Sequence, residues 1–221
     1  SEKAGMISPA NLLTTTIGDD LKLATNQQSK VIAVSPKDRA SILPGGRSAN
    51  AAYWFDGTTG NMLSRPWYTK SLPGWVTAFN NKQLAEKYLQ SNWNTLLPIG
   101  EYIESTADSN AWEDTYTKTT APVFPYSLAK INDELIKKGK NKFDLLRATP
   151  YGNSYTKAMA MAAIEGEKLG MQNTTDMLCI SFSSTDYVGH QFGPNSIEAE
   201  DTYLRLDKDL GELIDYLDIK I

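Results

Sequence analysis

The chain has 221 residues, of which 41% are hydrophobic and 22% are charged, and its formal net charge is −4 at pH 7. This length and composition are typical of a globular protein with one substantial core. The negative charge and the lack of a Lys/Arg run exclude an extended nucleic-acid surface. The single cysteine, Cys179, excludes an internal disulfide and a cysteine-rich metal site. No segment reaches the roughly 18 consecutive apolar residues of a membrane helix.

A serine followed by a proline predicts the first helix. Ser8 can cap a helix, and Pro9 suits the first helical position. The apolar residues after them recur at spacings that approximate one helical face. We therefore expect an amphipathic helix over residues 10–25.

Short apolar stretches predict strands in the region that follows. Residues 31–34 are expected to form a buried strand, and 40–43 a second strand-like piece. The stretches 51–55 and 61–64 flank the glycine-containing loop 56–60, a pattern typical of a β-hairpin.

Residues 66–125 differ in texture from the rest of the chain. Four of the five tryptophans lie here, among Asn, Thr, Ser and Pro, with one helical pattern over 76–90. We expect an irregular, aromatic-rich insertion or cap subregion within a single domain-like unit that comprises residues 1–221.

The last third returns to regular patterns. Helices are expected over 127–138 and 154–169, a strand over 177–182, and a long helix over 196–217. On the long helix, leucines such as Leu210 are expected to face inward. Glu200 and the (i, i+4) ion pair of Asp201 with Arg205 are expected to face water. The alternation of strand and helix at both ends indicates an α/β fold in which helices cover a sheet.

Asp186 and His190 form the first candidate site. His190 is the only histidine of the chain, and it lies in an expected loop just after the apolar strand. An aspartate and a histidine at the carboxyl end of a buried strand are typical of a zinc site in α/β enzymes. The alternative is a loop aspartate that caps nearby amides and a histidine that hydrogen-bonds a carbonyl.

Lys37, Asp38 and Arg39 form the second candidate site. In an extended segment, Lys37 and Arg39 would share one face because alternate residues of a strand point the same way. Two cations at the end of a strand can clamp a phosphate or sulfate oxyanion. The alternative is a solvated loop in which Asp38 pairs with its neighbours.

Three segments, residues 35–39, 49–56 and 182–194, resemble the alkaline phosphatase superfamily. More narrowly, they resemble its bacterial periplasmic zinc phosphomonoesterases with a Lys-x-Arg pair, to which type I phosphodiesterases and nucleotide pyrophosphatases are related. The resemblance covers essentially the whole chain. It implies a three-layer α/β/α core with two zinc ions, a small phosphate-ester substrate, and a periplasmic or secreted location, although this chain shows no signal peptide.

The resemblance also implies roles for the candidate residues. Asp186 and His190 would be two of the three ligands of one zinc ion, which activates the hydrolytic water. Lys37 and Arg39 would bind the non-bridging phosphoryl oxygens, stabilise the transition state and favour monoesters over diesters. A threonine or serine nucleophile would form a covalent phospho-enzyme.

The chain departs from the family pattern at both ends. The nucleophile, a first metal-binding Asp and a phosphate-binding Asn are expected before Ser1, and an Asp-His pair and a final His after Ile221. We therefore expect an internal fragment with an incomplete core, which by itself binds no zinc tightly and has no phosphatase activity. The alternatives are a phosphodiesterase or nucleotide pyrophosphatase of the same superfamily, and a non-catalytic phosphatase-like binding module.

Overall fold

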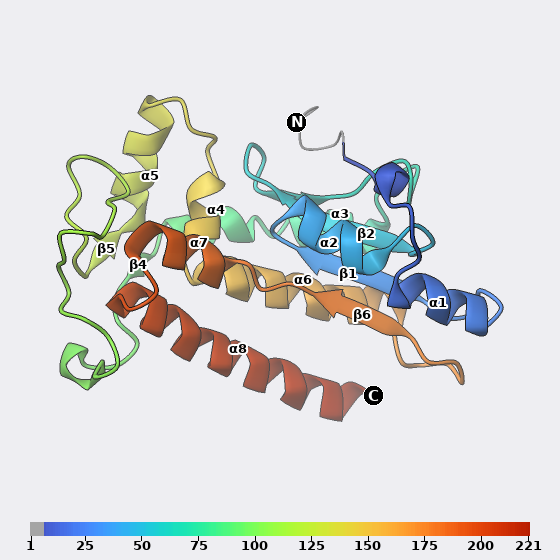
Figure 1. The fold of residues 1–221 in the computed structure, drawn as a ribbon. Helices are drawn as coiled ribbons and strands as arrows, with labels where there is room; N and C mark the ends of the chain where they lie inside the picture. The colour runs from blue at the N-terminus through green and yellow to red at the C-terminus, as the bar shows by residue number, and fades with distance from the viewer. Residues whose placement is uncertain (1–6) are drawn as a thin grey trace.

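A four-stranded sheet forms the centre of the computed structural model, which describes residues 7–221 (Figure 1). Its strand order is β3-β2-β1-β6. The strands are β1 (Val31–Ser35), β2 (Ala51–Asp56), β3 (Asn61–Leu63) and β6 (Met177–Ile180). β1 is parallel to both β2 and β6, whereas β3 runs antiparallel to β2 and forms the predicted hairpin. The carboxyl ends of the three parallel strands therefore meet at one edge of the sheet.

Burial along the strands follows their places in the sheet. Every residue of the central strand β1 is buried, as expected of a parallel strand covered on both faces. Every residue of β6 is only half-buried, because β6 is the edge strand of the described sheet. The strand predicted over 177–182 is shorter than expected and ends at Ile180.

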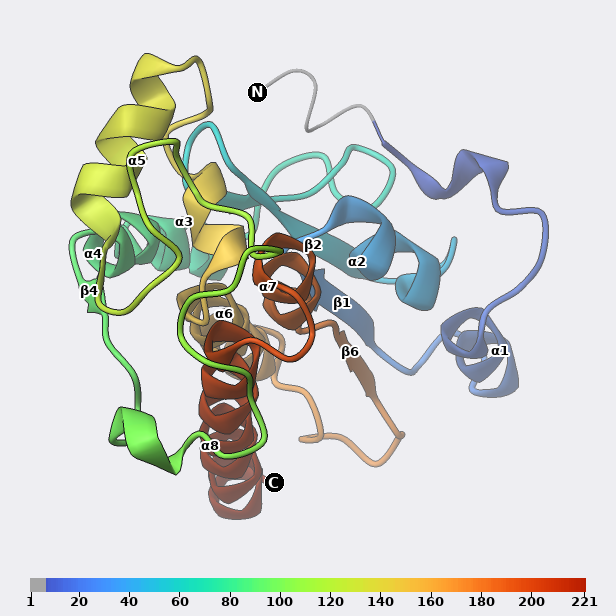
Figure 2. The ribbon, with the colours of Figure 1, turned by 60° about the vertical axis from the view of Figure 1, so that its left-hand side comes forward.

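Helices cover both faces of the sheet, which confirms the predicted three-layer α/β arrangement (Figures 1 and 2). Alternate side chains of β1 and β2 pack on opposite sides, as the two-residue period of a strand requires. Ala33 and Trp54 pack with Ile42 of α2 (Asp38–Gly45). Val34 and Phe55 lie in the larger core with α6 (Tyr151–Glu167).

Two predictions for the N-terminal region are wrong, the first in part and the second completely. The helix expected over 10–25 is a short 3-10 turn, η1 (Pro9–Asn11), followed by α1 (Ile17–Ala24). Ser8 does cap η1, but Thr16 starts α1 because its hydroxyl accepts from the Asp19 N–H while Asp19 accepts from the Thr16 N–H. The expected strand over 40–43 lies inside helix α2.

The aromatic-rich region 66–125 contains short elements. They are α3 (Gly74–Asn80), α4 (Leu84–Leu89), β4 (Asn92–Trp93) and η2 (Ile99–Glu101), and β4 pairs with β5 (Tyr126–Ser127). The helix expected over 76–90 is broken between α3 and α4, where Gln83 adopts a left-handed conformation with φ of 50°. A helix cannot continue through such a residue.

The helices predicted in the last third occur near their expected places, as α5 (Leu128–Lys137), α6 and α8 (Ile197–Lys220). Two further helices, η3 (Asp144–Ala148) and α7 (Ser184–Phe192), were not predicted. Within residues 7–221, no helix is long and apolar enough to cross a membrane. Leu210, expected to face inward on α8, is 37% exposed.

Acidic residues at the start of α8 hold the segment between β4 and β5. Asp201 forms the predicted ion pair with Arg205 (2.6 Å), but it is fully buried rather than facing water. Its carboxylate also accepts from Trp93 Nε1 (2.7 Å), the Leu96 N–H (2.6 Å) and the Tyr102 hydroxyl (2.5 Å). Glu200, also expected to face water, is half-buried and accepts from the Ser105 hydroxyl.

Glu198, in the first turn of α8, is buried as well, with 1% of its surface exposed. Its carboxylate bonds the Tyr126 hydroxyl. Burial, together with the nearby carboxylates of Glu113 and Asp108, raises the pKa of Glu198 to about 7.

Candidate active site

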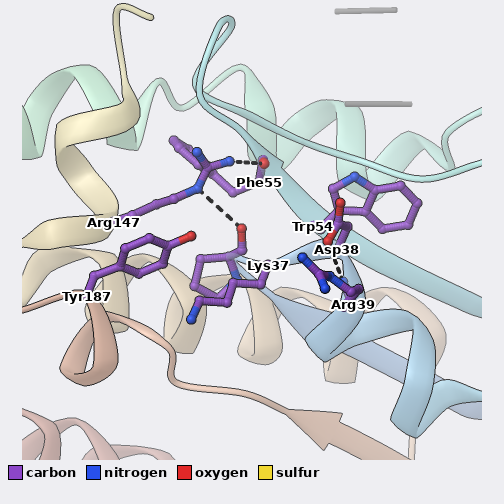
Figure 3. A pocket seen from close by; sticks show the side chains of 8 residues that line it. Lys37, Asp38, Arg39, Trp54, Phe55, Arg147 and Tyr187 are labelled. Carbon is purple, nitrogen blue, oxygen red and sulfur yellow. Dashed lines mark hydrogen bonds between the residues drawn. The ribbon is translucent and has the colours of Figure 1, made fainter. Parts of the chain in front are cut away.

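A pocket of about 520 Å³ opens at the carboxyl ends of β1 and β2 (Figure 3). Ligands of open α/β sheets bind at this edge, because the loops that follow parallel strands converge there. The lining residues come from the end of β1, the start of α2, the end of β2, η3 and α7: Pro36, Lys37, Asp38, Arg39, Trp54, Phe55, Arg147 and Tyr187.

Lys37 and Arg39 both line the pocket, but not on an extended segment as predicted. Lys37 is the N-cap of α2 and has an extended backbone, whereas Arg39 lies in the first turn of the helix. Asp38 accepts a hydrogen bond from the main-chain N–H of Arg39 (2.6 Å). The strand-to-helix transition, rather than strand alternation, therefore brings the two cations to one pocket (Figure 3).

The Lys37 ammonium lies between two side chains of α7. It forms an ion pair with the Asp186 carboxylate and lies 4.5 Å from the centre of the Tyr187 ring. The hydrogen bond from Lys37 lowers the pKa of Asp186, so this carboxylate is ionised at neutral pH. The two candidate sites of the sequence are thus in direct contact, although 149 positions separate Lys37 from Asp186.

Asp186 and His190 lie on helix α7 and not in a loop, which corrects the prediction. Their spacing of four residues places both side chains on one face of the helix, with His190 Nε2 3.4 Å from Asp186 Oδ1. Their side chains are 51% and 83% exposed, respectively. An oxygen donor and a nitrogen donor this close together suit zinc. Within the described part of the chain, no group of three or more His, Cys, Asp or Glu side chains could hold a metal ion, so these two donors do not by themselves complete a zinc site.

Serine and asparagine side chains fix the start of α7. Ser183 Oγ lies 3.3 Å from Ser35 Oγ at the end of β1, and the Ser184 N–H donates to Asn153 of α6 (3.1 Å). Because β6 leads into α7 through this anchored turn, Asp186 and Tyr187 emerge beside the end of β1.

Sequence reasoning did not single out Arg147 and Tyr187 of this pocket. Tyr187 lies inside the segment that carried the family resemblance and next to Asp186, which was a usable signal. Arg147 lies in η3 with no motif around it, and only the fold places it beside β1 and β2.

Comparison with known proteins defines the class of the chain. Residues 16–220 match the family described as type I phosphodiesterase / nucleotide pyrophosphatase. The chain belongs to this family.

Individual relatives are similar to the chain over nearly all its length. Alkaline phosphatase PhoV of Synechococcus elongatus is 52% identical over 219 residues, which are 99% of this chain and 38% of that protein. Alkaline phosphatase PafA of Elizabethkingia meningoseptica is 50% identical over 221 residues, 100% of this chain and 39% of that protein. A Myroides odoratus protein named calcium-transporting ATPase is also 50% identical over 221 residues, 99% of this chain and 39% of that protein.

The fold agrees with a solved structure. The crystal structure of wild-type PafA matches with a TM-score of 0.92 and 51% identity, and the match covers 100% of this chain and 41% of that chain. This chain therefore spans about two fifths of the length of these relatives, and its α/β core is the corresponding part of an alkaline phosphatase fold.

Proposed function

We propose that this chain is part of a zinc-dependent phosphate monoester hydrolase, an alkaline phosphatase that acts through a covalent phospho-enzyme. One observation carries the proposal: the cations Lys37 and Arg39 and the metal-donor pair Asp186 and His190 meet at one sheet edge, joined by the Lys37–Asp186 ion pair. Phosphoryl transfer needs cations around the non-bridging oxygens, and this arrangement supplies them.

Lys37 and Arg39 are the proposed phosphoryl-binding residues. Arginine can bind two phosphoryl oxygens at once, while lysine offers a compact point charge. Together they offset the charge on the non-bridging oxygens. A monoester presents one more charged oxygen than a diester, so this pair favours monoesters.

Asp186 and His190 are the proposed ligands of one zinc ion, with further ligands supplied from outside this chain. When bound, zinc supplies Lewis-acid chemistry to phosphoryl transfer. The His190 imidazole is exposed and the Asp186 carboxylate is half-exposed, so both are accessible to an incoming ion. The nucleophile, a threonine or serine by family resemblance, would also lie outside residues 1–221.

The names of the relatives support this assignment. PhoV and PafA are both named alkaline phosphatases. A second PafA structure, with a TM-score of 0.91, is of a variant substituted at a threonine, an asparagine, a lysine and an arginine. That lysine and arginine are two positions apart, which is the spacing of Lys37 and Arg39.

Relative rates on three substrates test the proposal. The full-length protein, loaded with zinc, is assayed on an aryl phosphate monoester, on the corresponding methyl aryl diester, and on ATP because one relative is named an ATPase. We expect the monoester to have the highest kcat/KM. In the double variant Lys37→Ala/Arg39→Ala, the ratio of kcat/KM for the monoester to kcat/KM for the diester should fall by about 100-fold or more.

A phosphodiesterase or nucleotide pyrophosphatase is the second candidate, because the matching family carries that description. A strong diester preference in the unmodified protein would establish it and contradict the monoesterase assignment. Zinc-loaded protein that hydrolyses none of these three substrates would instead favour the non-catalytic binding module.

We further propose that residues 66–125 are a cap subregion of one domain-like unit and that the protein is periplasmic or secreted. Support for the cap comes from main-chain hydrogen bonds to the chain just after His190: Asp114 N–H to the Gln191 carbonyl (2.9 Å) and Thr106 N–H to the Asn195 carbonyl (2.8 Å). This segment passes beside α7 and the start of α8 (Figure 2). The location rests on family resemblance alone, and cell fractionation of the full-length protein tests it.

A further inference from the structure

Arg147 connects the segments that leave β1 and β2. The last residue pair of these parallel strands is Ser35 with Trp54. Just beyond it, the Arg147 guanidinium donates from Nη2 to the Phe55 carbonyl (2.8 Å) and from Nε to the Pro36 carbonyl (3.4 Å) (Figure 3). One side chain thus holds both main chains at the point where the strand pairing ends.

Further contacts fix the guanidinium itself. Arg147 Nη1 lies 2.7 Å from Asp144 Oδ1, and the guanidinium carbon lies 5.1 Å from the centre of the Phe55 ring. The Arg147 side chain is only 22% exposed. Because its charge is paired with Asp144 and three of its nitrogens already donate, its role is to hold protein groups rather than substrate.

The held carbonyl of Pro36 directly precedes Lys37. Its position sets where the chain turns from β1 into α2, and therefore where Lys37 and Arg39 lie. A second bond supports the same turn, since the Lys37 N–H donates to Ser35 Oγ (3.0 Å). We infer that Arg147 is a positioning residue for the phosphoryl-binding pair Lys37 and Arg39, an inference that rests on the proposed function.

Lysine cannot replace arginine in this role. Three bonds in three directions within one plane require the guanidinium fork, whereas an ammonium concentrates its donors at one point. Arg147→Lys therefore keeps the charge in the pocket and removes the positioning, which separates the two effects.

The test is the selectivity of the zinc-loaded, full-length protein between an aryl phosphate monoester and its methyl diester. Small displacements of catalytic groups cost up to about 100-fold in rate. We expect Arg147→Lys to lower kcat/KM for the monoester by about 10- to 100-fold and for the diester much less, because the diester depends less on the cation pair.

Arg47→Lys is the matched control. Arg47 also donates to main-chain carbonyls, of Leu12 (3.0 Å) and Ala10 (3.5 Å), and lies over an aromatic ring, that of Trp67 at 5.4 Å. It does not line the pocket. Its replacement should leave the monoester-to-diester ratio unchanged.

Equal losses on both esters, or no loss on either, would overturn the inference. If Arg147→Lys does not fold, Asp144→Asn takes its place: it loosens the guanidinium without removing it, and an unchanged ratio would again overturn the inference. Titration calorimetry with inorganic phosphate needs no turnover. It should show weaker phosphate binding in Arg147→Lys even if the unmodified protein proves not to be a monoesterase, so failure of the proposed function can be told apart from failure of this inference.

Discussion

Replacing Gly57 with alanine should disturb Asp144 and, through it, Arg147, which lines the candidate active site. Gly57 follows β2 in the turn of the hairpin, and its carbonyl accepts from the Phe143 N–H (2.8 Å). A Cβ atom at Gly57 would lie 1.8 Å from Asp144 Oδ1, 2.8 Å from Asp144 Cγ and 3.1 Å from Arg147 Nη1. In Gly57→Ala, the Asp144 carboxylate must therefore move away from Arg147.

The expected cost has two parts. Inserting a methyl group into a filled space costs about 1–3 kcal/mol. Asp144 is partly exposed, so loss of its ion pair with Arg147 adds only about 0.5 kcal/mol. We expect Gly57→Ala to lower the free energy of unfolding by about 2 kcal/mol. Because Arg147 keeps its bonds to both carbonyls, the monoester-to-diester ratio should fall by only about threefold, less than in Arg147→Lys.

Denaturant unfolding and the two ester assays on the full-length protein measure these effects. Gly74→Ala is the control, because a Cβ at Gly74 meets no atom within 4 Å; it should leave the ester ratio unchanged and should not lower the free energy of unfolding. The reasoning is refuted if Gly57→Ala leaves the ester ratio unchanged while Arg147→Lys lowers it, since Asp144 would then not restrain the guanidinium. It is also refuted if Gly57→Ala is as stable as the control.

Three further predictions concern the full-length protein. Asp201→Ala should lower the free energy of unfolding by about 3–5 kcal/mol, since it leaves the Arg205 charge and the donors of Trp93 and Tyr102 without their acceptor; Asp215→Ala on the exposed side of α8 is the control in denaturant unfolding. Glu198 has a higher pKa in the folded state, about 7, than the roughly 4.3 of an unfolded chain, so its contribution to stability is present at low pH and is lost as pH rises through 7. Glu198→Gln should therefore flatten the decline in stability between about pH 4.3 and 7, and an unchanged slope in urea unfolding over this range would contradict the prediction. His190→Ala should lower the zinc retained after dialysis, measured by elemental analysis, and unchanged retention would refute its role as a ligand.

The elements that the sequence predicted correctly have strong local signals. The buried strand at 31–34 and the hairpin around residues 56–60 have the apolar patterns and turn residues of their structures, and they occur as expected. The wrong predictions fall where tertiary packing overrides the preference indicated by the local sequence pattern. Residues 40–43 have strand-like composition, yet they lie in α2 because Ile42 packs against the sheet from a helix. Asp201 has the spacing of a surface ion pair, yet it is buried by partners from residues 93–102.

The candidate site was predicted in its parts but not in its assembly. Lys37, Arg39, Asp186 and His190 were identified from motifs, and the structure brings Lys37 into contact with Asp186. That contact depends on the pairing of β1 with β6, a long-range pairing that local patterns do not encode. Arg147 was missed for the same reason, because its role consists entirely of contacts with distant main-chain carbonyls.

The three cations of the pocket differ in how far their charge is compensated. Arg147 is paired with Asp144, and Lys37 with Asp186. Arg39 is exposed, and among residues 7–221 no hydrogen bond or ion pair engages its guanidinium. Under the proposed function, an incoming phosphate dianion would meet Arg39 as the uncompensated charge, at a site where the fork geometry of arginine can bind two oxygens. Lys37 would then share its charge between the substrate and Asp186, which lies in the proposed metal site.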